Sequence, residues 1–198
     1  MRRIWRRSVR KTGLGHVRII AGSLRGSKLS VLEADGLRPT GDRVRETLFN
    51  WLQNRIAGRR VLDLFAGSGA LGFEAASRGA AEVLLVESHA PAAASLRASR
   101  ERLKANRLQV LQADALAWLA GNAGERFDLV FLDPPFASDF WPRLWPLLLP
   151  LLNDGALVYV EAAASAALAL PAGLTALKEG KTRESRYLLA QWQKPAGG

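Results

Sequence analysis

The chain has no cysteine and only two histidines, His16 and His89. Without cysteine, disulfide bonds, thiolate metal ligands and covalent catalysis by a thiolate are excluded. Two isolated histidines do not make a zinc site, so no metal is expected.

Long apolar stretches are also absent. No run of about 18 consecutive apolar residues occurs, so no transmembrane span is expected, and the arginine-rich N-terminus lacks the apolar segment of a secretory signal. We therefore expect a soluble cytoplasmic protein in which residues 1–16 form a disordered basic tail. The acid-free start is also typical of an organellar transit peptide, but the tail is the favoured interpretation.

Acidic residues are scarce in the first third of the chain. Residues 1–60 contain 15 Lys and Arg but 4 Asp and Glu, a charge of +11, whereas residues 61–198 carry −1. Such segregation is typical of an element that binds a polyanion, most often through phosphate groups. A merely solvated face is the alternative, but so few acids lie between the bases that nucleic acid is favoured.

What the sequence does contain is a pattern of alternating strands and helices. With 198 residues, a hydrophobic content of 48% and no linker rich in Ser, Gly or Pro, the chain can bury one large core. Apolar runs and periodicity predict strands over residues 17–20, 28–32, 61–65, 82–87, 108–112, 127–132, 155–161, 174–179 and 185–192, and helices over 42–56, 70–78, 91–106 and from 115. A further helix, capped by Ser138 or Asp139, should break or kink at Pro146 and Pro150. The alternation is typical of a doubly wound α/β sheet, here with a small N-terminal β-hairpin extension.

The most informative stretch is Val61–Gly72, which reads V-L-D-L-F-A-G-S-G-A-L-G. A strand containing Asp63 leads into a turn with Gly67 and Gly69, where the absence of Cβ atoms lets a ligand approach main-chain N–H groups. The G-x-G-x-x-G match is weak by itself, but it favours a nucleoside-bearing cofactor. Glu87 ends the next strand twenty residues past Gly67, a spacing at which a carboxylate accepts hydrogen bonds from ribose hydroxyls.

Another strand, 127–132, ends in Asp133-Pro134-Pro135-Phe136. Proline cannot continue a strand ladder, so this strand must stop with an acid, bare carbonyls and an aromatic ring at its carboxyl end. In an open α/β sheet, ligands bind at that end of the strands.

With these residues the chain resembles the Rossmann-like S-adenosylmethionine-dependent methyltransferases, and among them those that methylate exocyclic amino groups, whose hallmark is Asp/Asn-Pro-Pro-Phe/Tyr. The stretches Arg18–Gly22, Leu37–Thr40, Asp42–Asn50 and Phe65–Gly72 are similar to the bacterial family that methylates guanine N2 in 16S ribosomal RNA. The resemblance spans most of the chain. It implies a seven-stranded sheet closed by an antiparallel hairpin, with a methyltransferase domain over 58–194 and an RNA-facing extension over 17–57.

The resemblance also implies roles for individual residues. S-adenosyl-L-methionine would lie against Asp63, Phe65, Ala66, Gly67, Ser68, Gly69, Glu87, Asp114 and Ala115. The catalytic residues would be Asp133, Pro134, Pro135 and Phe136, with Asp133 and the Pro134 carbonyl accepting hydrogen bonds from the guanine amine and Phe136 stacking on the base. RNA would be contacted by Arg18, Arg25, Lys28, Arg38, Arg43 and Arg45, of which Arg43 and Arg45 lie off the apolar face of their predicted helix. Asp114 has an alternative role as the N-cap of the helix that follows it.

The implied partner is 16S ribosomal RNA in an assembled or assembling small ribosomal subunit, methylated by a monomer during ribosomal RNA processing. With no cysteine, methyl transfer would be direct. A DNA adenine-N6 or protein glutamine methyltransferase could use the same Pro-Pro turn, although 198 residues leave little room for a target-recognition domain. A NAD-dependent dehydrogenase would not be expected to have Asp-Pro-Pro-Phe. A non-catalytic ribosome-binding protein would explain the charge but not the glycine turn, Glu87 and Asp133 together.

Overall fold

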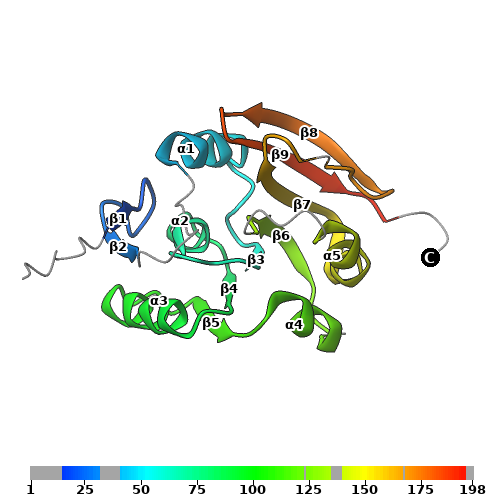
Figure 1. Cartoon of the computed structure of the whole chain (residues 1–198). Coiled ribbons are helices and arrows are strands. Elements are labelled where there is room, and N and C mark those ends of the chain that lie inside the picture. The colour runs from blue at the N-terminus through cyan, green and yellow to red at the C-terminus, as the bar shows by residue number, and fades with distance from the viewer. Residues whose placement is uncertain (1–14, 32–40, 123, 135–139, 167, 195–198) are drawn as a thin grey trace, which may run out of the picture.

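The computed structural model describes residues 15–31, 41–122, 124–134, 140–166 and 168–194 (Figure 1). Its elements follow one another along the chain as β1 (Gly15–Arg18), β2 (Lys28–Val31), α1 (Asp42–Trp51), β3 (Arg60–Asp63), α2 (Ala70–Ser77), β4 (Glu82–Glu87), α3 (Ala90–Arg102), β5 (Leu108–Gln112), α4 (Ala115–Gly121), β6 (Phe127–Leu132), α5 (Trp141–Leu148), a 3₁₀ turn (Leu149–Leu151), β7 (Leu152–Ala163), β8 (Leu174–Lys181) and β9 (Ser185–Trp192).

Seven of the strands form one sheet in the order β5-β4-β3-β6-β7-β9-β8. The first five in this order are parallel, and β9 is antiparallel to both β7 and β8. The parallel strands therefore end along a common edge, which we call the carboxyl edge; they begin along the opposite one, the amino edge. The predicted doubly wound, seven-stranded sheet with a closing hairpin is confirmed, and its order reverses between β3 and β6, where ligands bind in such folds.

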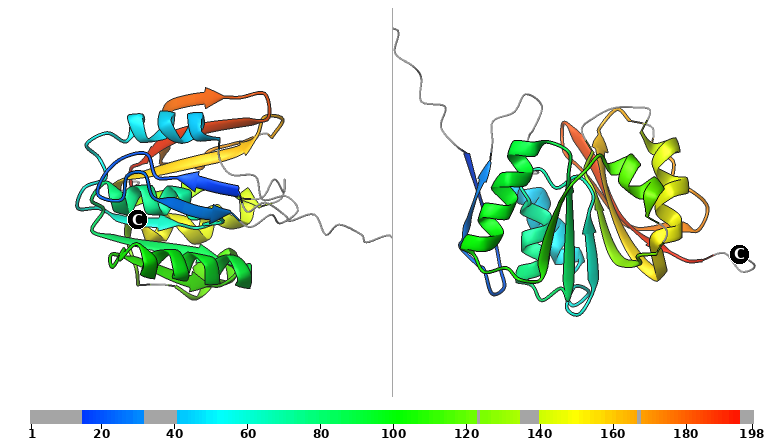
Figure 2. Two further views of the ribbon diagram at one scale, coloured as in Figure 1. Left: turned by 90° about the vertical axis from the view of Figure 1, so that its left-hand side faces the viewer. Right: turned by 90° about the horizontal axis from the view of Figure 1, so that it is seen from below.

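Helices cover both faces of this sheet (Figure 2). One core joins α1, α2 and α3 to the sheet, whereas α4 and α5 share the other core. Neighbouring residues of a strand point to opposite faces, so Val61 lies in the first core and Leu62 in the second, and both are fully buried. This two-sided burial explains why the parallel strands are continuous apolar runs in the sequence.

The β1–β2 hairpin is anchored to α2. The carboxylate of Glu74, which is fully buried, accepts hydrogen bonds from the backbone N–H groups of Ile20 (2.7 Å) and Ala21 (3.0 Å). The hydroxyl of Ser77 donates to the Ala21 carbonyl. Gly22 has a φ of 83°, and a Cβ there would lie 1.9 Å from the Ser77 carbonyl oxygen. Only glycine allows this close approach of the hairpin tip to the end of α2.

The other end of the hairpin packs near the start of the same helix. Val17 of β1 and Val31 of β2 form a small apolar cluster with Ala70, the first residue of α2. The hairpin thus lies along α2, with its tip at the amino edge and its open end at the carboxyl edge.

Several predicted boundaries differ from the structure; the helix predicted over 91–106 ends at Arg102, for example, and the strand predicted from residue 155 begins at Leu152. The helix predicted to reach about Ile56 ends at Trp51, because the chain turns at Asn54, whose φ is 64°. Ile56 is nevertheless buried, so its side chain continues the apolar pattern from a turn. The first strand begins at Gly15, two residues before the predicted start, so residues 15 and 16 are not part of a disordered tail.

Proline affects α5 less than predicted. The helix continues through Pro146 and changes to a 3₁₀ turn only at Leu149, with Pro150 inside that turn. Pro142 lies in the first turn of α5, where its missing N–H has no intrahelical partner to lose. The caps predicted at Ser138 and Asp139 fall outside the described residues.

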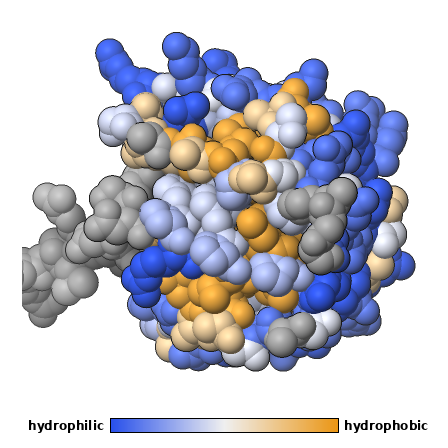
Figure 3. All heavy atoms as spheres, turned by 90° about the vertical axis from the view of Figure 1, so that its right-hand side faces the viewer, coloured by the Kyte–Doolittle hydropathy of each residue, from blue (hydrophilic) through white to orange (hydrophobic). Residues whose placement is uncertain are grey.

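Figure 3 shows the side of the molecule that carries α5, where apolar side chains gather in patches among hydrophilic ones. In the described part of the chain, no helix is long and apolar enough to cross a membrane.

Candidate functional site

The glycine turn connects the end of β3 to the start of α2 at the carboxyl edge. Gly67 and Gly69 have φ values of 51° and 77°, in the region that glycine adopts without strain. Gly72, in the first turn of α2, faces the sheet, and a Cβ there would come within 2.1 Å of the Leu85 side chain. The glycines therefore set the shape of the turn and the close packing of α2 on the sheet.

Glu87, at the end of β4, holds this turn. Its carboxylate accepts hydrogen bonds from the backbone N–H of Gly67 (2.8 Å) and of His89 (2.7 Å), and the residue is buried. Each carboxylate oxygen can accept a second hydrogen bond. Glu87 thus combines a structural contact with remaining capacity to accept bonds from a ligand.

Asp63 is buried beneath the turn and accepts a hydrogen bond from the backbone N–H of Gly72 (3.0 Å). Burial raises the pKa of this carboxyl to about 7; the Gly72 hydrogen bond opposes the rise, and the charges of Asp133 and Glu87 add to it. Asp63, Glu87 and Asp133 are therefore electrostatically coupled at the ends of three neighbouring strands.

Asp133 and Pro134 directly follow β6 at the carboxyl edge, with Asp133 partly buried and Pro134 buried. Beside them on β7, the hydroxyl of Tyr159 donates to Glu161 (2.8 Å) inside the protein. Burial, then the charges of Glu161 and Asp133, raises the pKa of Tyr159 well above its usual value. This buried pair was not predicted, because Tyr159 and Glu161 were read only as strand residues. Pro135 and Phe136 lie outside the described residues.

Asp114 follows β5 and caps α4, accepting a hydrogen bond from the Ala117 N–H (2.9 Å). The capping role that the sequence left open for Asp114 is thus present. The carboxylate of Asp114 is exposed, so it is also accessible to a ligand. Ala115 is buried, Ser68 is half-buried, and Phe65 packs edge-on against Phe140, with 5.0 Å between ring centroids.

Arg45 is not where the sequence analysis placed it. The prediction that it lies off the buried face of its helix is wrong, because Arg45 is 1% exposed. Its guanidinium donates to the Arg18 carbonyl (3.0 Å) and to Asp42 (2.7 Å), so it joins α1 to the hairpin. Such a buried group cannot contact RNA without first leaving these partners.

The other cations predicted to bind RNA are exposed where the structure describes them. Arg18, Lys28 and Arg43 are on the surface, and Arg25 lies at the hairpin tip, next to the Leu24 N–H that donates to Ser77. Arg25 is therefore at the amino edge, away from Asp133. Arg38 lies outside the described residues.

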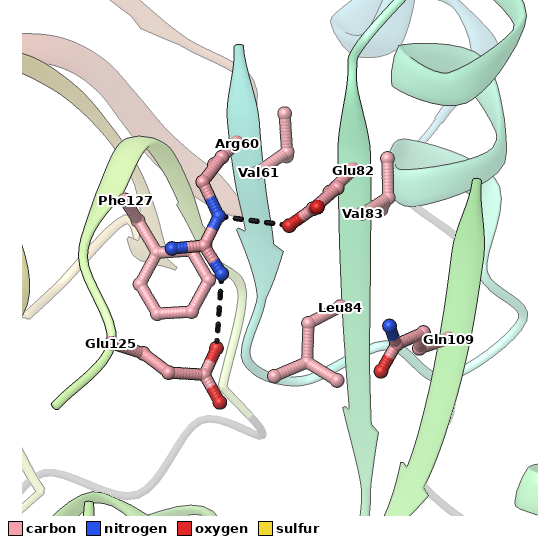
Figure 4. A pocket seen from close by; sticks show the side chains of 8 residues that line it. All are labelled: Arg60, Val61, Glu82, Val83, Leu84, Gln109, Glu125 and Phe127. Atoms are coloured by element: carbon pink, nitrogen blue, oxygen red, sulfur yellow. Dashed lines mark hydrogen bonds and ion pairs between the residues drawn. The ribbon is translucent and has the colours of Figure 1, made fainter.

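A hollow at the amino edge is distinct from this site (Figure 4). Arg60 and Glu82, the first residues of β3 and β4, line it together with Glu125 and Phe127. The guanidinium of Arg60 pairs with Glu82 (2.9 Å) and Glu125 (3.5 Å) and lies 5.6 Å from the centroid of the Phe127 ring. These charges already satisfy one another at the end of the sheet opposite the glycine turn.

Comparison with known proteins agrees with this arrangement. The family model described as "Conserved hypothetical protein 95" matches residues 17–191. Ribosomal RNA small subunit methyltransferase D from Haemophilus influenzae is 44% identical over 182 residues, covering 89% of this chain and 94% of that protein. The structure of a putative methyltransferase, yhhF, from Escherichia coli has a TM-score of 0.83 and 41% identity, covering 91% of this chain and all of that one.

A more distant structure has the same fold. It is the Thermus thermophilus 16S rRNA N2 G1207 methyltransferase in complex with AdoMet and guanosine, with a TM-score of 0.68, 24% identity and coverage of 91% of this chain and 50% of that one. The family predicted from the sequence motifs is confirmed by the family model and by the relatives that share more than 40% identity. The chain belongs to the "Conserved hypothetical protein 95" family, together with the small-subunit ribosomal RNA methyltransferase D proteins.

Proposed function

We propose that this protein transfers a methyl group from S-adenosyl-L-methionine to the exocyclic N2 amine of a guanine in 16S ribosomal RNA. The observation that carries the proposal is the meeting of the glycine turn, Glu87 and Asp133-Pro134 at the carboxyl edge. It is supported by 44% identity to a protein named as a small-subunit ribosomal RNA methyltransferase.

The residues at this edge fit the cofactor. Glu87 can accept further hydrogen bonds from ribose hydroxyls. Gly67 and Gly69 shape the turn but do not offer free N–H groups, because Gly67 donates to Glu87 (2.8 Å) and Gly69 donates to the Ala66 carbonyl (2.6 Å). The side of Gly69 that lacks a Cβ packs against Leu96 and Phe73. Phe65, Ala66 and Ser68 complete the turn. Asp114 and Ala115, which follow β5 at the same edge, would contact the adenine. When bound, the cofactor would supply a methyl group on a positively charged sulfur.

Asp133 and Pro134 orient the amine. The lone pair of guanine N2 is delocalised into the ring, so the amine is a poor nucleophile while it remains planar. A carboxylate oxygen of Asp133 and the carbonyl oxygen of Pro134 would each accept a hydrogen bond from one N–H of the amine. These two hydrogen bonds favour a pyramidal nitrogen whose lone pair points toward the methyl group. Orientation and hydrogen bonding thus supply the rate enhancement, and the extra proton of the methylated amine is released to water.

The substrate we propose is a guanine in a loop or flipped out of a helix, because protein groups reach base edges there. Phe136, outside the described residues, remains the proposed stacking partner. The exposed Arg18, Lys28 and Arg43 remain proposed RNA contacts. Arg25 lies at the amino edge, so it would contact RNA only if the RNA extends to that edge. We further propose that a monomer acts in the cytoplasm on an assembled or assembling small subunit.

Substitution of Asp133 tests the chemistry. Asp133→Ala should lower the single-turnover methyl-transfer rate by on the order of 10²-fold, the effect of losing a positioned transition-state hydrogen bond. Asp133→Asn keeps one acceptor oxygen and should retain more activity. Asp154→Asn, an exposed acid near the start of β7, is the matched control and should behave as the wild type.

Cofactor affinity should stay the same in all three variants. If Asn is as inactive as Ala while cofactor and RNA still bind, Asp133 acts as a general base and the acceptor mechanism is wrong. Methyl transfer to another nucleotide, or to DNA in preference to RNA, would overturn the proposed substrate.

A further inference from the structure

The turn between β8 and β9 lies on the same edge of the sheet as Asp133. In the ladder between β6 and β7, Leu132 is level with Val160, and in the ladder between β7 and β9, Ser185 is level with Ala163. Because β7 is parallel to β6, both Ala163 and Ser185 lie beyond the end of β6. The β8–β9 turn, which we define as residues 181–186, therefore projects from the carboxyl edge.

The strand geometry gives the separation between this turn and Asp133. Two steps across the sheet, from β6 to β7 and from β7 to β9, correspond to about 10 Å at about 4.8 Å per step. The three residues from Val160 to Ala163 add about 10 Å along the strand. A single-stranded RNA segment of a few nucleotides would reach both places at once.

This turn contains three cations and one acid, the exposed Glu184, so its net charge is +2. Lys181 and Arg183 are exposed and Arg186 is partly exposed. Among the described residues, these three cations form no ion pair within 4.0 Å with any acid. The net charge of −1 over residues 61–198 conceals this concentration, because acids elsewhere in the same sequence segment cancel it.

The backbone of the turn is held in place before any ligand binds. The hydroxyl oxygen of Thr182 accepts hydrogen bonds from the N–H groups of Glu184 (3.2 Å) and Ser185 (2.9 Å). The Ala164 N–H donates to the Glu184 carbonyl (2.8 Å), which ties the turn to the end of β7. A fixed backbone lowers the ordering cost of binding, so cations carried by this turn are well suited to a defined row of phosphates.

We propose that the β8–β9 turn is a second RNA-binding element, in which Lys181, Arg183 and Arg186 contact phosphates of the strand that carries the target guanine. The N-terminal cations would then act together with a group of cations from the other end of the chain. This proposal rests on the proposed function, because the position of the target base at Asp133 sets the strand's path.

A pair of charge-matched double variants tests it. Lys181→Gln with Arg183→Gln removes two cations from the turn, whereas Arg55→Gln with Arg126→Gln removes two exposed cations close to the start of β3 and β6, at the amino edge. The probe is the small ribosomal subunit from cells that lack this protein, with binding measured between 50 and 200 mM salt. The same titration is repeated with protein-free 16S ribosomal RNA.

We expect the turn variant to bind at least about tenfold more weakly at low salt, with a slope of log affinity against log salt shallower by about 1.4 to 1.8, since each lost phosphate contact contributes about 0.7 to 0.9. The amino-edge variant should keep the wild-type slope. Calorimetric titration with S-adenosyl-L-methionine should give wild-type affinity for both, which shows that both are folded.

Equal slopes for the two variants would overturn the proposal. A loss seen with subunits but not with protein-free RNA would also overturn it, because the turn would then contact a ribosomal protein. Methyl transfer by the wild type is measured on the same subunits. If no methyl transfer is detected, the proposed function is refuted. The salt slopes of binding test the RNA contacts of the turn whether or not methyl transfer occurs.

Discussion

Asp63 should make the stability of the cofactor-free protein fall as the pH rises through neutrality. Its carboxyl is buried, and its pKa of about 7 reflects that burial together with repulsion from Asp133 and Glu87. The informative change is Asp63→Asn, because an amide oxygen can still accept the Gly72 N–H but carries no charge.

The sign follows from proton binding in the two states. An unfolded aspartate has a pKa of about 3.9, so between about pH 4 and pH 7 the folded state binds more protons than the unfolded state. The free energy of unfolding therefore decreases as the pH rises through this window, and above it the full cost of the buried charge is present. A shift of about three units corresponds to about 4 kcal/mol over the whole window, of which about 2 to 3 kcal/mol falls between pH 5 and 8.

Urea denaturation of the wild type and of Asp63→Asn at several pH values from 5 to 8 measures this contribution. We expect the variant to gain about 2 to 3 kcal/mol relative to the wild type on going from pH 5 to pH 8. Asp154→Asn, which removes an exposed acid, should follow the wild type. Parallel curves for the wild type and Asp63→Asn would show that Asp63 is already ionised throughout, and the argument from burial would fail.

Two further predictions concern contacts of the turn and the hairpin. Glu87→Ala should weaken cofactor binding in calorimetric titration by about 1 to 3 kcal/mol, and Glu87→Gln should weaken it less because one acceptor oxygen remains; unchanged affinity in Glu87→Ala would remove this residue from the site. Gly22→Ala and Gly26→Ala both place a side chain at a φ near +83° (83° and 82°), but only the Cβ at position 22 meets the Ser77 carbonyl. Gly22→Ala should therefore be less stable to denaturation than Gly26→Ala by about 1 to 3 kcal/mol, the scale of hydrogen bonds lost between the hairpin tip and α2. Equal stabilities of the two variants would contradict the anchoring of the hairpin tip on α2.

Sequence reasoning succeeded where the signal is local. The strands Glu82–Glu87 and Phe127–Leu132 have the predicted bounds, because buried parallel strands are continuous apolar runs that end at polar or turn residues. The glycine turn and the acids at the ends of β3, β4 and β6 were found for the same reason, since each directly follows or ends such a run.

It failed where a residue's partner is distant in the sequence. Arg45 was expected at the surface because it lies off the apolar face of the helix predicted from the sequence. One of its partners, Asp42, is three residues away, but the other is the backbone carbonyl of Arg18, 27 residues away, which no periodicity reveals. Glu74 likewise accepts hydrogen bonds from residues 53 and 54 positions earlier, so its role in anchoring the hairpin depends on the tertiary fold.

The distribution of charge shows why the fold must be known before an RNA surface is assigned. Counted along the sequence, positive charge belongs to residues 1–60. In the structure, Arg25 from that segment lies with the hairpin tip beside Ser77, a full α2 length of about 12 Å from the start of that helix at the carboxyl edge. Arg183 comes from the segment of nearly neutral charge, yet its turn lies on the edge that carries Asp133. Because a bound RNA strand would contact an edge of the sheet and not a sequence segment, we expect the cations of the carboxyl edge to position the target base, whichever end of the chain supplies them.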